Sequence, residues 1–411
     1  MSAYATSLCC TNCGTTYPLE ARFACDRCFS AVEPTYDWDA LSRDLTRERI
    51  ESGPHSLWRY RDLLPVDAAP GGLQVGLTPL VPAPRLAAEL GLRELYVKVE
   101  AANPTHSFKD RVVSVASAKA IELGFEAIAC ASTGNLAGAV AAQAAALGVD
   151  AYIFVPADLE REKIIAACVP GARVFAVDGN YDDVNRLCAE LAYDKPWGFV
   201  NVNVRAYYAQ GSKTLAFETA EQLGWRLPDV TVTPIASGSL YHKIHKGYGE
   251  LLRVGLVDGD RPRAFGAQAA GCSPVARAWE TGAETVTPVR PDTIAKSLAI
   301  GSPADGLNAL AVARESGGAI AAVSEDEIIE GIGLLARTTG IFTETAGGVT
   351  VATLAKLVAE GHIRPEESTV AYITGDGLKT PDAALRHVRT FAVEADPDAV
   401  DAVLDRESVP V

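Results

Sequence analysis

The alternation of short apolar runs with helix-like segments from residue 95 onward restricts the fold of this chain more than any other feature. Strands are predicted over residues 95–100, 127–132, 151–156, 173–178, 231–237, 263–269 and 369–374. Helices are predicted over residues 109–124, 134–148, 160–168, 325–339 and 347–360, and Gly124 and Gly148 would end the first two. Strands separated by helices pair in parallel and need helices on both faces of the sheet. The pattern therefore predicts an α/β fold.

Length and charge limit the class of protein. A chain of 411 residues can form two or three domains, and its 48% hydrophobic and 22% charged residues are typical of a globular protein. The net charge of −15 argues against a nucleic-acid partner, which needs a basic face, but allows a small anionic substrate held by a local cluster. The first residues lack a signal-like apolar core, and no apolar run reaches about 18 residues. We expect a cytoplasmic protein with no membrane partner.

Two cysteine pairs near the start of the chain predict a metal site. Cys10 and Cys13, like Cys25 and Cys28, are separated by two residues, and eleven residues lie between the pairs. This spacing lets four thiolates surround one structural Zn²⁺, with no open position for catalysis. The alternatives are chance pairs or a redox dithiol, and Cys9 is interpreted as a bystander. The remaining cysteines are predicted core residues: Cys130, Cys168, Cys188 and Cys272.

The chain divides into four predicted parts. Residues 1–32 would form the zinc ribbon, and residues 33–94 one charged helix followed by an extended arm. Residues 95–385 would form the α/β body, with a smaller mobile lobe at about residues 110–205. Acidic side chains dominate the end of the chain, so residues 386–411 are predicted to form a solvated, partly ordered tail.

Three loops that follow predicted strands carry small or polar residues. They span residues 130–138, 234–244 and 372–380, and their notable residues are Ser132, Thr133, Asn135, Ser237, Gly238, Ser239 and Thr374. In open α/β sheets, ligands bind beyond the carboxyl ends of the strands, where helix N-termini present free N–H groups. The first loop suits a carboxylate, the second a phosphate and the third a ring nitrogen. One such loop alone is weak evidence, because strand-to-helix turns favour these residues anyway.

Lys109 lies in the stretch "NPTHSFKDR", residues 103–111, just before a predicted helix. Alone, it is either an ordinary helix-entry lysine or a nucleophile. Together with the three loops, it completes the parts needed to hold pyridoxal phosphate and an amino acid: an amine, a phosphate seat, a carboxylate seat and a hydroxyl.

The same stretch resembles the lysine motif of the fold type II pyridoxal-phosphate enzymes, and most of all that of the threonine synthases. Further resemblances lie in "LWRYRDLLP" (57–65), "LTPLV" (77–81), "STGN" (132–135), "GSKTLAFE" (211–218), "TIAKSLAIGSPADG" (293–306), "FTETAGGVT" (342–350) and "ITGDGLK" (373–379). The resemblance implies two lobes, each with a mostly parallel sheet flanked by helices. The chain departs from the family at His106, where members often have glycine, and in the loop "SGSL" at residues 237–240.

The resemblance also implies roles for individual residues. Lys109 would bind the cofactor covalently and move protons, and Asn135 would contact the ring hydroxyl. Thr374 would face the ring nitrogen with a neutral hydroxyl, which suits elimination better than transamination. The cofactor phosphate would bind at Ser237, Gly238, Ser239 and Leu240. Substrate would bind at Lys98, Ser107, Arg111, Ser132, Thr133, Asn203 and Arg205, with Ser132 and Thr133 holding its carboxylate.

The reaction implied by the resemblance converts O-phospho-L-homoserine and water to L-threonine and phosphate. Two alternatives share the fold: a serine or threonine dehydratase, and a β-replacing enzyme similar to cysteate synthase. A third, from another class, is an interaction protein with a zinc ribbon and an inactive body. A homodimer is expected only because soluble enzymes commonly pair.

Overall fold

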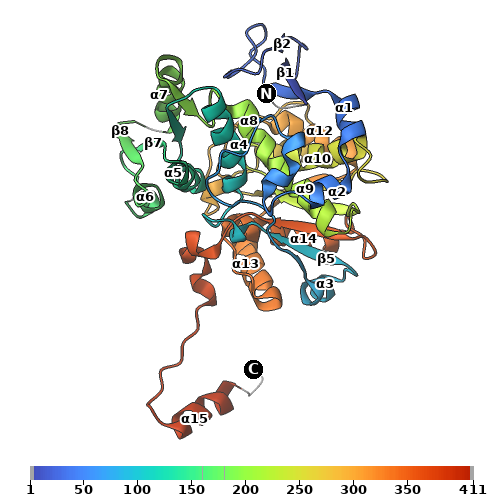
Figure 1. Cartoon of the computed structure of the whole chain (residues 1–411). Helices are drawn as coiled ribbons and strands as arrows, with labels where there is room; N and C mark the ends of the chain where they lie inside the picture. The colour runs from blue at the N-terminus through green and yellow to red at the C-terminus, as the bar shows by residue number, and fades with distance from the viewer. Residues whose placement is uncertain (1–3, 160, 180, 408–411) are drawn as a thin grey trace.

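The computed structural model describes residues 4–159, 161–179 and 181–407. Figure 1 shows two α/β lobes with a small antiparallel sheet packed on top of them. The predicted α/β fold with two parallel-sheet cores is confirmed. None of the described helices is both long enough and apolar enough to cross a membrane.

The larger sheet has six strands in the order β12-β11-β10-β13-β5-β4. Every neighbouring pair is parallel except β4 and β5, which are antiparallel at the edge. The strands are β4 (Leu80–Pro82), β5 (Leu95–Val99), β10 (Val230–Pro234), β11 (Arg263–Ala269), β12 (Ala319–Val323) and β13 (Thr369–Ile373). The carboxyl ends of the parallel strands lie at one edge, which is where ligands bind in such sheets.

Helices cover both faces of this larger sheet. One core joins it to α3 (Pro84–Leu90), α13 (Glu325–Thr339) and α14 (Thr345–Ala359), and another joins it to α9 (Lys213–Gln222) and α10 (Ser239–Arg253). Helices α11 (Pro274–Glu280) and α12 (Gly306–Ser316) pack beside β11 and β12. Because both faces are covered, the strands are largely buried, and β12 ("AIAAV") is apolar throughout.

The smaller sheet has four parallel strands in the order β8-β7-β6-β9. They are β6 (Ala127–Ala131), β7 (Asp150–Pro156), β8 (Arg173–Val177) and β9 (Trp197–Phe199). The helices of this lobe are α4 (Lys109–Glu122), α5 (Asn135–Leu147), α6 (Arg161–Cys168) and α7 (Tyr181–Asp194). Glu160, the first residue of the predicted helix over 160–168, lies outside the described residues.

The N-terminal segment differs from its prediction. Strands β1 (Ala5–Cys10), β2 (Thr16–Tyr17) and β3 (Val32–Tyr36) form the antiparallel sheet of the ribbon. The single helix predicted after residue 33 is instead two short helices, α1 (Trp38–Asp44) and α2 (Arg47–Glu51), followed by the 3-10 turn Leu57–Leu63. The helices separate because Leu45 is extended and the Thr46 side chain caps the next N-terminus.

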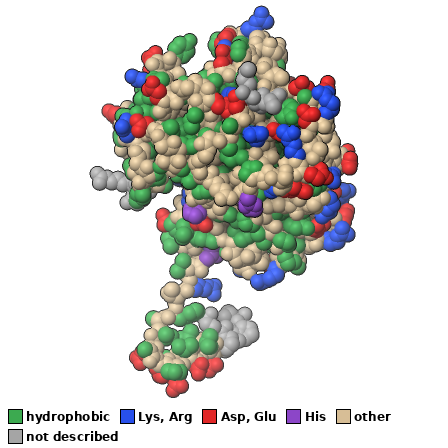
Figure 2. Space-filling model, in the orientation of Figure 1, with side chains coloured by type: hydrophobic (Ala, Val, Ile, Leu, Met, Phe, Trp, Pro, Cys, Tyr) green, Lys and Arg blue, Asp and Glu red, His purple; other side chains and the backbone are tan. Residues whose placement is uncertain are grey.

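The C-terminal tail leaves the body as an extended segment that ends in α15 (Pro397–Glu407), as Figure 1 shows. Figure 2 shows acidic side chains along the outer edge of this helix, and Val400 and Leu404 are exposed on it. The predicted tail therefore contains a regular helix, and residues 408–411 lie outside the described part of the chain.

Candidate active site

Lys109 is the first residue of α4, at the end of a loop anchored to the edge of the larger sheet. The Phe108 amide donates to the Thr374 carbonyl at 3.0 Å, and the Asp376 amide donates to the His106 carbonyl at 3.1 Å. These bonds hold the loop beside the carboxyl end of β13. The half-buried Lys109 therefore begins α4 directly after a residue that is bonded to Thr374.

The Lys109 amine has aromatic and hydroxyl neighbours. Its Nζ lies 4.6 Å from the centre of the Phe108 ring and donates to the Tyr208 hydroxyl at 3.2 Å. Tyr208 belongs to α8 (Arg205–Tyr208), a short helix followed by the 3-10 turn Ala209–Ser212. Sequence reasoning missed Tyr208, because nothing in "RAYYAQ" distinguishes a site tyrosine from a core tyrosine.

Glu344, at the start of α14, joins the predicted residues into one site. Its Oε2 accepts from Asn135 Nδ2 at 3.0 Å, and its carboxylate also bonds the Thr374 side chain. Burial raises the pKa of this carboxyl, while Asn135 and the charges of Lys379 and Lys109 act in the opposite direction. The sequence signal was present in "FTETAGGVT", but that stretch was used only for the resemblance.

The second predicted loop forms the start of α10. Gly238 has φ +94°, and a Cβ there would come within 2.5 Å of the Asp305 carbonyl oxygen, so glycine is required. The Asp305 amide donates to the Ser237 carbonyl at 2.8 Å and closes the loop. Ser239 and Leu240 lie in the first turn, where helix N–H groups have no intrahelical acceptor. This arrangement can bind a phosphate.

Three of the predicted substrate residues, Ser107, Ser132 and Thr133, lie in the loops around Lys109 and Asn135. Ser132 and Thr133 lie between β6 and Asn135, and the Ser132 hydroxyl accepts from the Gly134 amide at 3.3 Å. Ser107 is buried, and its hydroxyl accepts from the Lys109 amide at 3.3 Å. These three residues lie next to the site in sequence, and their contact with substrate stays a prediction.

Lys98 and Arg111 lie in a buried ion-pair network. Lys98 Nζ donates to Glu218 at 2.9 Å, and Arg111 Nε donates to Glu100 at 2.6 Å. All four side chains are fully buried, and Arg111 also pairs with Glu218. This placement favours a structural role for both cations over the predicted contact with a substrate phosphate, because neither ion is exposed.

Asn203 lies just before α8, and Arg205 is the first residue of that helix. The Asn203 side chain accepts from the Phe199 amide at 2.8 Å and donates to the Trp197 carbonyl at 3.1 Å, so it closes its own turn. Arg205 pairs with Asp305 at 2.8 Å and keeps 28% of its side chain exposed. Of the predicted cations, Arg205 therefore keeps exposed surface beside the phosphate loop.

His106 has a left-handed backbone with φ +61°. Glycine adopts this conformation without strain, which explains physically why the family often has glycine at this position. The exposed ring makes one contact, between Nδ1 and the Ala101 carbonyl at 3.2 Å.

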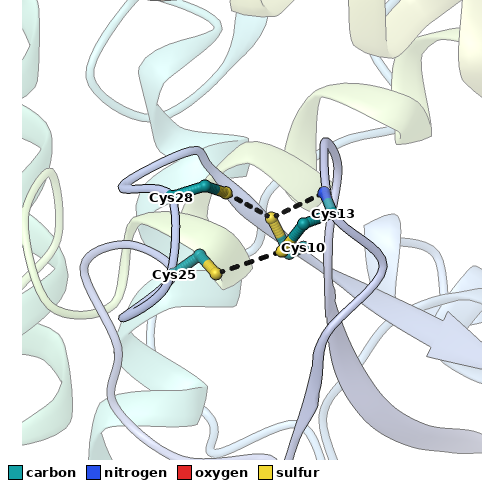
Figure 3. A group of neighbouring side chains, drawn as sticks. All are labelled: Cys10, Cys13, Cys25 and Cys28. Carbon is teal, nitrogen blue, oxygen red and sulfur yellow. Dashed lines mark hydrogen bonds between the residues drawn. The ribbon is translucent and has the colours of Figure 1, made fainter.

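The four predicted metal ligands come together in the ribbon (Figure 3). Their sulfur atoms all lie within 4.8 Å of one another, with Cys10 and Cys28 at 3.4 Å and Cys13 and Cys25 at 3.5 Å. Tetrahedral Zn–S bonds of about 2.3 Å would place sulfurs about 3.8 Å apart, so the cluster fits Zn²⁺. Hydrogen bonds from Ser30 lower the pKa of the Cys28 thiol to about 6, which favours the thiolate.

Comparison with known proteins identifies the family of this chain. The family model described as "Pyridoxal-phosphate dependent enzyme" matches residues 72–375. The threonine synthase of Methanosarcina acetivorans is 37% identical over 405 residues, which is 97% of this chain and 98% of that protein. The threonine synthase of Methanocaldococcus jannaschii is 36% identical over 400 residues, with 96% and 98% covered.

Solved structures share the fold at low identity. Diaminopropionate ammonia lyase from Escherichia coli has a TM-score of 0.64 at 19% identity, covering 83% of this chain and 93% of that one. Maize serine racemase has a TM-score of 0.61 at 19% identity, covering 81% and 94%. The residues at the site also fit the cofactor, because a helix N-terminus with an obligatory glycine lies in the same body as a half-buried lysine amine. This chain belongs to the pyridoxal-phosphate-dependent enzyme family.

Proposed function

We propose that this protein is a threonine synthase, which converts O-phospho-L-homoserine and water to L-threonine and phosphate. The observation that carries the proposal is the grouping of Lys109, Asn135, Thr374 and Glu344 at the edge of the larger sheet. The curated relatives named threonine synthase support it, because two of them align with at least 96% of this chain.

Pyridoxal phosphate, when bound, supplies an electron sink for bonds broken next to the substrate amine. Lys109 would hold it covalently, the start of α10 would bind its phosphate, and Asn135 and Thr374 would contact its ring. Asn135 bonds Glu344 in the structure, so its amide is already oriented by a buried carboxyl.

The Lys109 amine would carry the protons of the reaction. It removes the α-proton of the substrate and then a β-proton, while phosphate leaves from the γ-carbon with the bonding electrons. The amine returns one proton to the γ-carbon and one to the α-carbon. Water adds its oxygen to the β-carbon, and its remaining proton goes to the phosphate product. One amine can serve all of these carbons because they lie on one side of it, and Ser132 and Thr133 would hold the substrate carboxylate.

The substrate phosphate needs a cation. We propose Arg205, because it is partly exposed and its partner Asp305 adjoins the loop at Ser237. Arg111 would instead join α4 to α9 through Glu218, and Lys98 would join β5 to the same carboxylate. Asn203 would fix the turn before α8. Arg205 would thus supply a positive charge for the anionic substrate, although the chain as a whole is acidic.

We also propose that the ribbon binds one structural Zn²⁺ through Cys10, Cys13, Cys25 and Cys28. Four thiolates leave no open position, so the metal would stabilise the fold and take no part in catalysis. A homodimer and a cytoplasmic location also stay predictions.

The proposal is tested by offering the holoenzyme three substrates in parallel. O-phospho-L-homoserine should yield phosphate and L-threonine in equal amounts, whereas L-serine or L-threonine would yield an oxo acid and ammonia with a dehydratase. Sulfite with O-phospho-L-serine would yield cysteate with the β-replacing enzyme. Lys109→Ala should abolish turnover and the cofactor absorbance near about 410 nm. Lys119→Ala, further along α4 and paired with Glu122, is the matched control and should keep both.

A further inference from the structure

We propose that Tyr208 is a further catalytic residue, which orients the free amine of Lys109, and that the zinc ribbon holds Tyr208 in place through α8. The role in turnover rests on the proposed function. The contact itself does not, because the Lys109 amine donates to the Tyr208 hydroxyl at 3.2 Å in the structure described here. Both side chains are half-buried, so the hydrogen bond is partly shielded from water.

The position of α8 against α4 is closely fixed. In the turn that follows α8, a Cβ on Gly211 would come within 2.5 Å of the Arg111 carbonyl oxygen and 2.6 Å of the Val112 Cα. The backbone of this turn therefore lies directly on the first turns of α4. Because Lys109 begins α4, this close packing sets the distance between its side chain and Tyr208.

The other side of α8 faces the ribbon. The Tyr207 hydroxyl donates to the Glu20 carbonyl at 2.9 Å, and the Arg22 amide donates to the Asn203 carbonyl at 2.8 Å. Glu20 and Arg22 lie between the two cysteine pairs, in the segment that a bound metal would close into a loop. The hydroxyl groups of two neighbouring tyrosines thus bond different partners: that of Tyr207 bonds the ribbon, and that of Tyr208 bonds the reactive amine.

A hydroxyl at this position meets a need of the reaction. A lysine has four rotatable bonds and a strongly hydrated ammonium group, so a freed amine tends to turn toward water. A hydrogen bond to a fixed hydroxyl keeps Nζ in the site between successive proton transfers. Tyr208 accepts that hydrogen bond from Nζ, so the amine stays directed into the site where the substrate carbons would lie.

The first experiment measures the reactivity of Lys109 without cofactor or substrate. In cofactor-free protein at fixed pH, the acetylation rate of Lys109 by acetic anhydride is followed by peptide mass spectrometry. Tyr208→Phe should raise this rate about threefold or more, because the amine loses the hydrogen bond that holds it in the half-buried site and can turn toward the reagent in solution. Tyr241→Phe, which removes a buried hydroxyl bonded to the Ala264 carbonyl at 2.7 Å, should leave the rate unchanged.

The second experiment uses the holoenzyme. Tyr208→Phe should lower kcat by about tenfold or more, with KM changed less than twofold, because the lost bond involves a charged group. Tyr208→Gln keeps a hydrogen-bond acceptor and should recover part of both effects. An unchanged acetylation rate in Tyr208→Phe together with wild-type kcat would overturn the role of Tyr208, whether or not O-phospho-L-homoserine is the substrate.

The ribbon is tested with Tyr207→Phe, which deletes the hydroxyl that contacts Glu20 and leaves Tyr208 intact. The acetylation rate of Lys109 should rise and kcat should fall, each about twofold or more and in the same direction as in Tyr208→Phe. If Tyr207→Phe matches Tyr241→Phe in both measurements, the ribbon does not position Tyr208.

Discussion

Glu344 is a buried acid held between an amide and two lysines. Burial raises the pKa of its carboxyl, and the hydrogen bond from Asn135 together with the nearby Lys379 and Lys109 charges keeps the ionised form available. An ionised carboxylate accepts from the Asn135 amide more strongly than a neutral acid does. Glu344 therefore orients a predicted cofactor ligand in a pH-dependent way.

Glu344→Gln tests this residue. A neutral amide of the same size is a weaker acceptor for Asn135 and does not titrate, so kcat should fall about tenfold. In the wild type, the fall in kcat on acidification should begin above the ordinary pKa of a glutamate, because burial raises that of Glu344. The variant should lack this acid limb. If the acid limb of the kcat–pH profile is the same in Glu344→Gln as in the wild type, another group titrates.

Site residues that belong to a characteristic motif could be predicted from the sequence. Site residues that reach the site from distant parts of the chain could not. Lys109 and Asn135 lie in recognisable stretches, and the structure brings them to one site. Glu344 bonds Asn135 across 209 positions of sequence, and Tyr208 meets Lys109 across 99. Such pairings depend on tertiary packing, which no local pattern encodes. The same holds for Lys98 and Arg111, whose acidic partners could not be seen from their own segments.

Among the elements, α10 depends on a backbone that only glycine adopts easily. Gly238→Ala would place a Cβ against the Asp305 carbonyl in a left-handed conformation and displace the first turn. We expect the dissociation constant of pyridoxal phosphate, measured by absorbance titration, to rise at least about tenfold. Gly282→Ala is the matched control: its φ is also positive, but its Cβ would meet nothing within 4 Å. If both variants bind pyridoxal phosphate with equal affinity, the start of α10 does not bind its phosphate.

The stability of the N-terminal ribbon should depend on its bound metal. Cys28→Ser removes one of four ligands and should lower the bound zinc, measured by atomic absorption, together with the midpoint of thermal unfolding. Cys9→Ser alters a neighbouring thiol outside the cluster and should change neither quantity. If Cys28→Ser keeps one zinc per chain, a different ligand set holds the metal.

Element prediction succeeded where an apolar run was bounded by turn residues. The helix predicted over 109–124 and the strand predicted over 263–269 correspond to α4 and β11 within two residues. The strand β12 was missed because "AIAAV" is short and alanine-rich, so periodicity cannot separate it from a helix segment. The helix predicted after residue 33 was wrong because side-chain caps at Asp37 and Thr46 divide it.

At the scale of the whole molecule, buried histidines link stability to pH. Burial lowers the pKa of His245 to about 4, whereas the unfolded chain titrates near its usual 6.5. Between these values the unfolded state binds more protons, so the free energy of unfolding falls as pH drops from 6.5 toward 4. His245→Gln should flatten this dependence in denaturant titrations, and the exposed His55→Gln should not. Identical slopes for wild type and His245→Gln would contradict the assignment.

The overall architecture followed from the alternation of strands and helices, since parallel pairing and covered faces allow few arrangements. The contact between ribbon and body could not be predicted in the same way. It rests on Glu33, which pairs with Lys243 and Lys246 of α10, and on the backbone of Glu20. These partners lie almost 200 residues or more away in sequence, so their encounter is a property of the folded molecule.

One turnover experiment in water enriched in ¹⁸O separates the proposed reaction from its alternatives. Holoenzyme with O-phospho-L-homoserine should release equal amounts of phosphate and L-threonine, with the label in the β-hydroxyl of threonine and none in the phosphate. That result places the cleaved bond at the γ-carbon and the added water at the β-carbon. Labelled phosphate with homoserine, or an oxo acid in place of threonine, would contradict the proposed reaction.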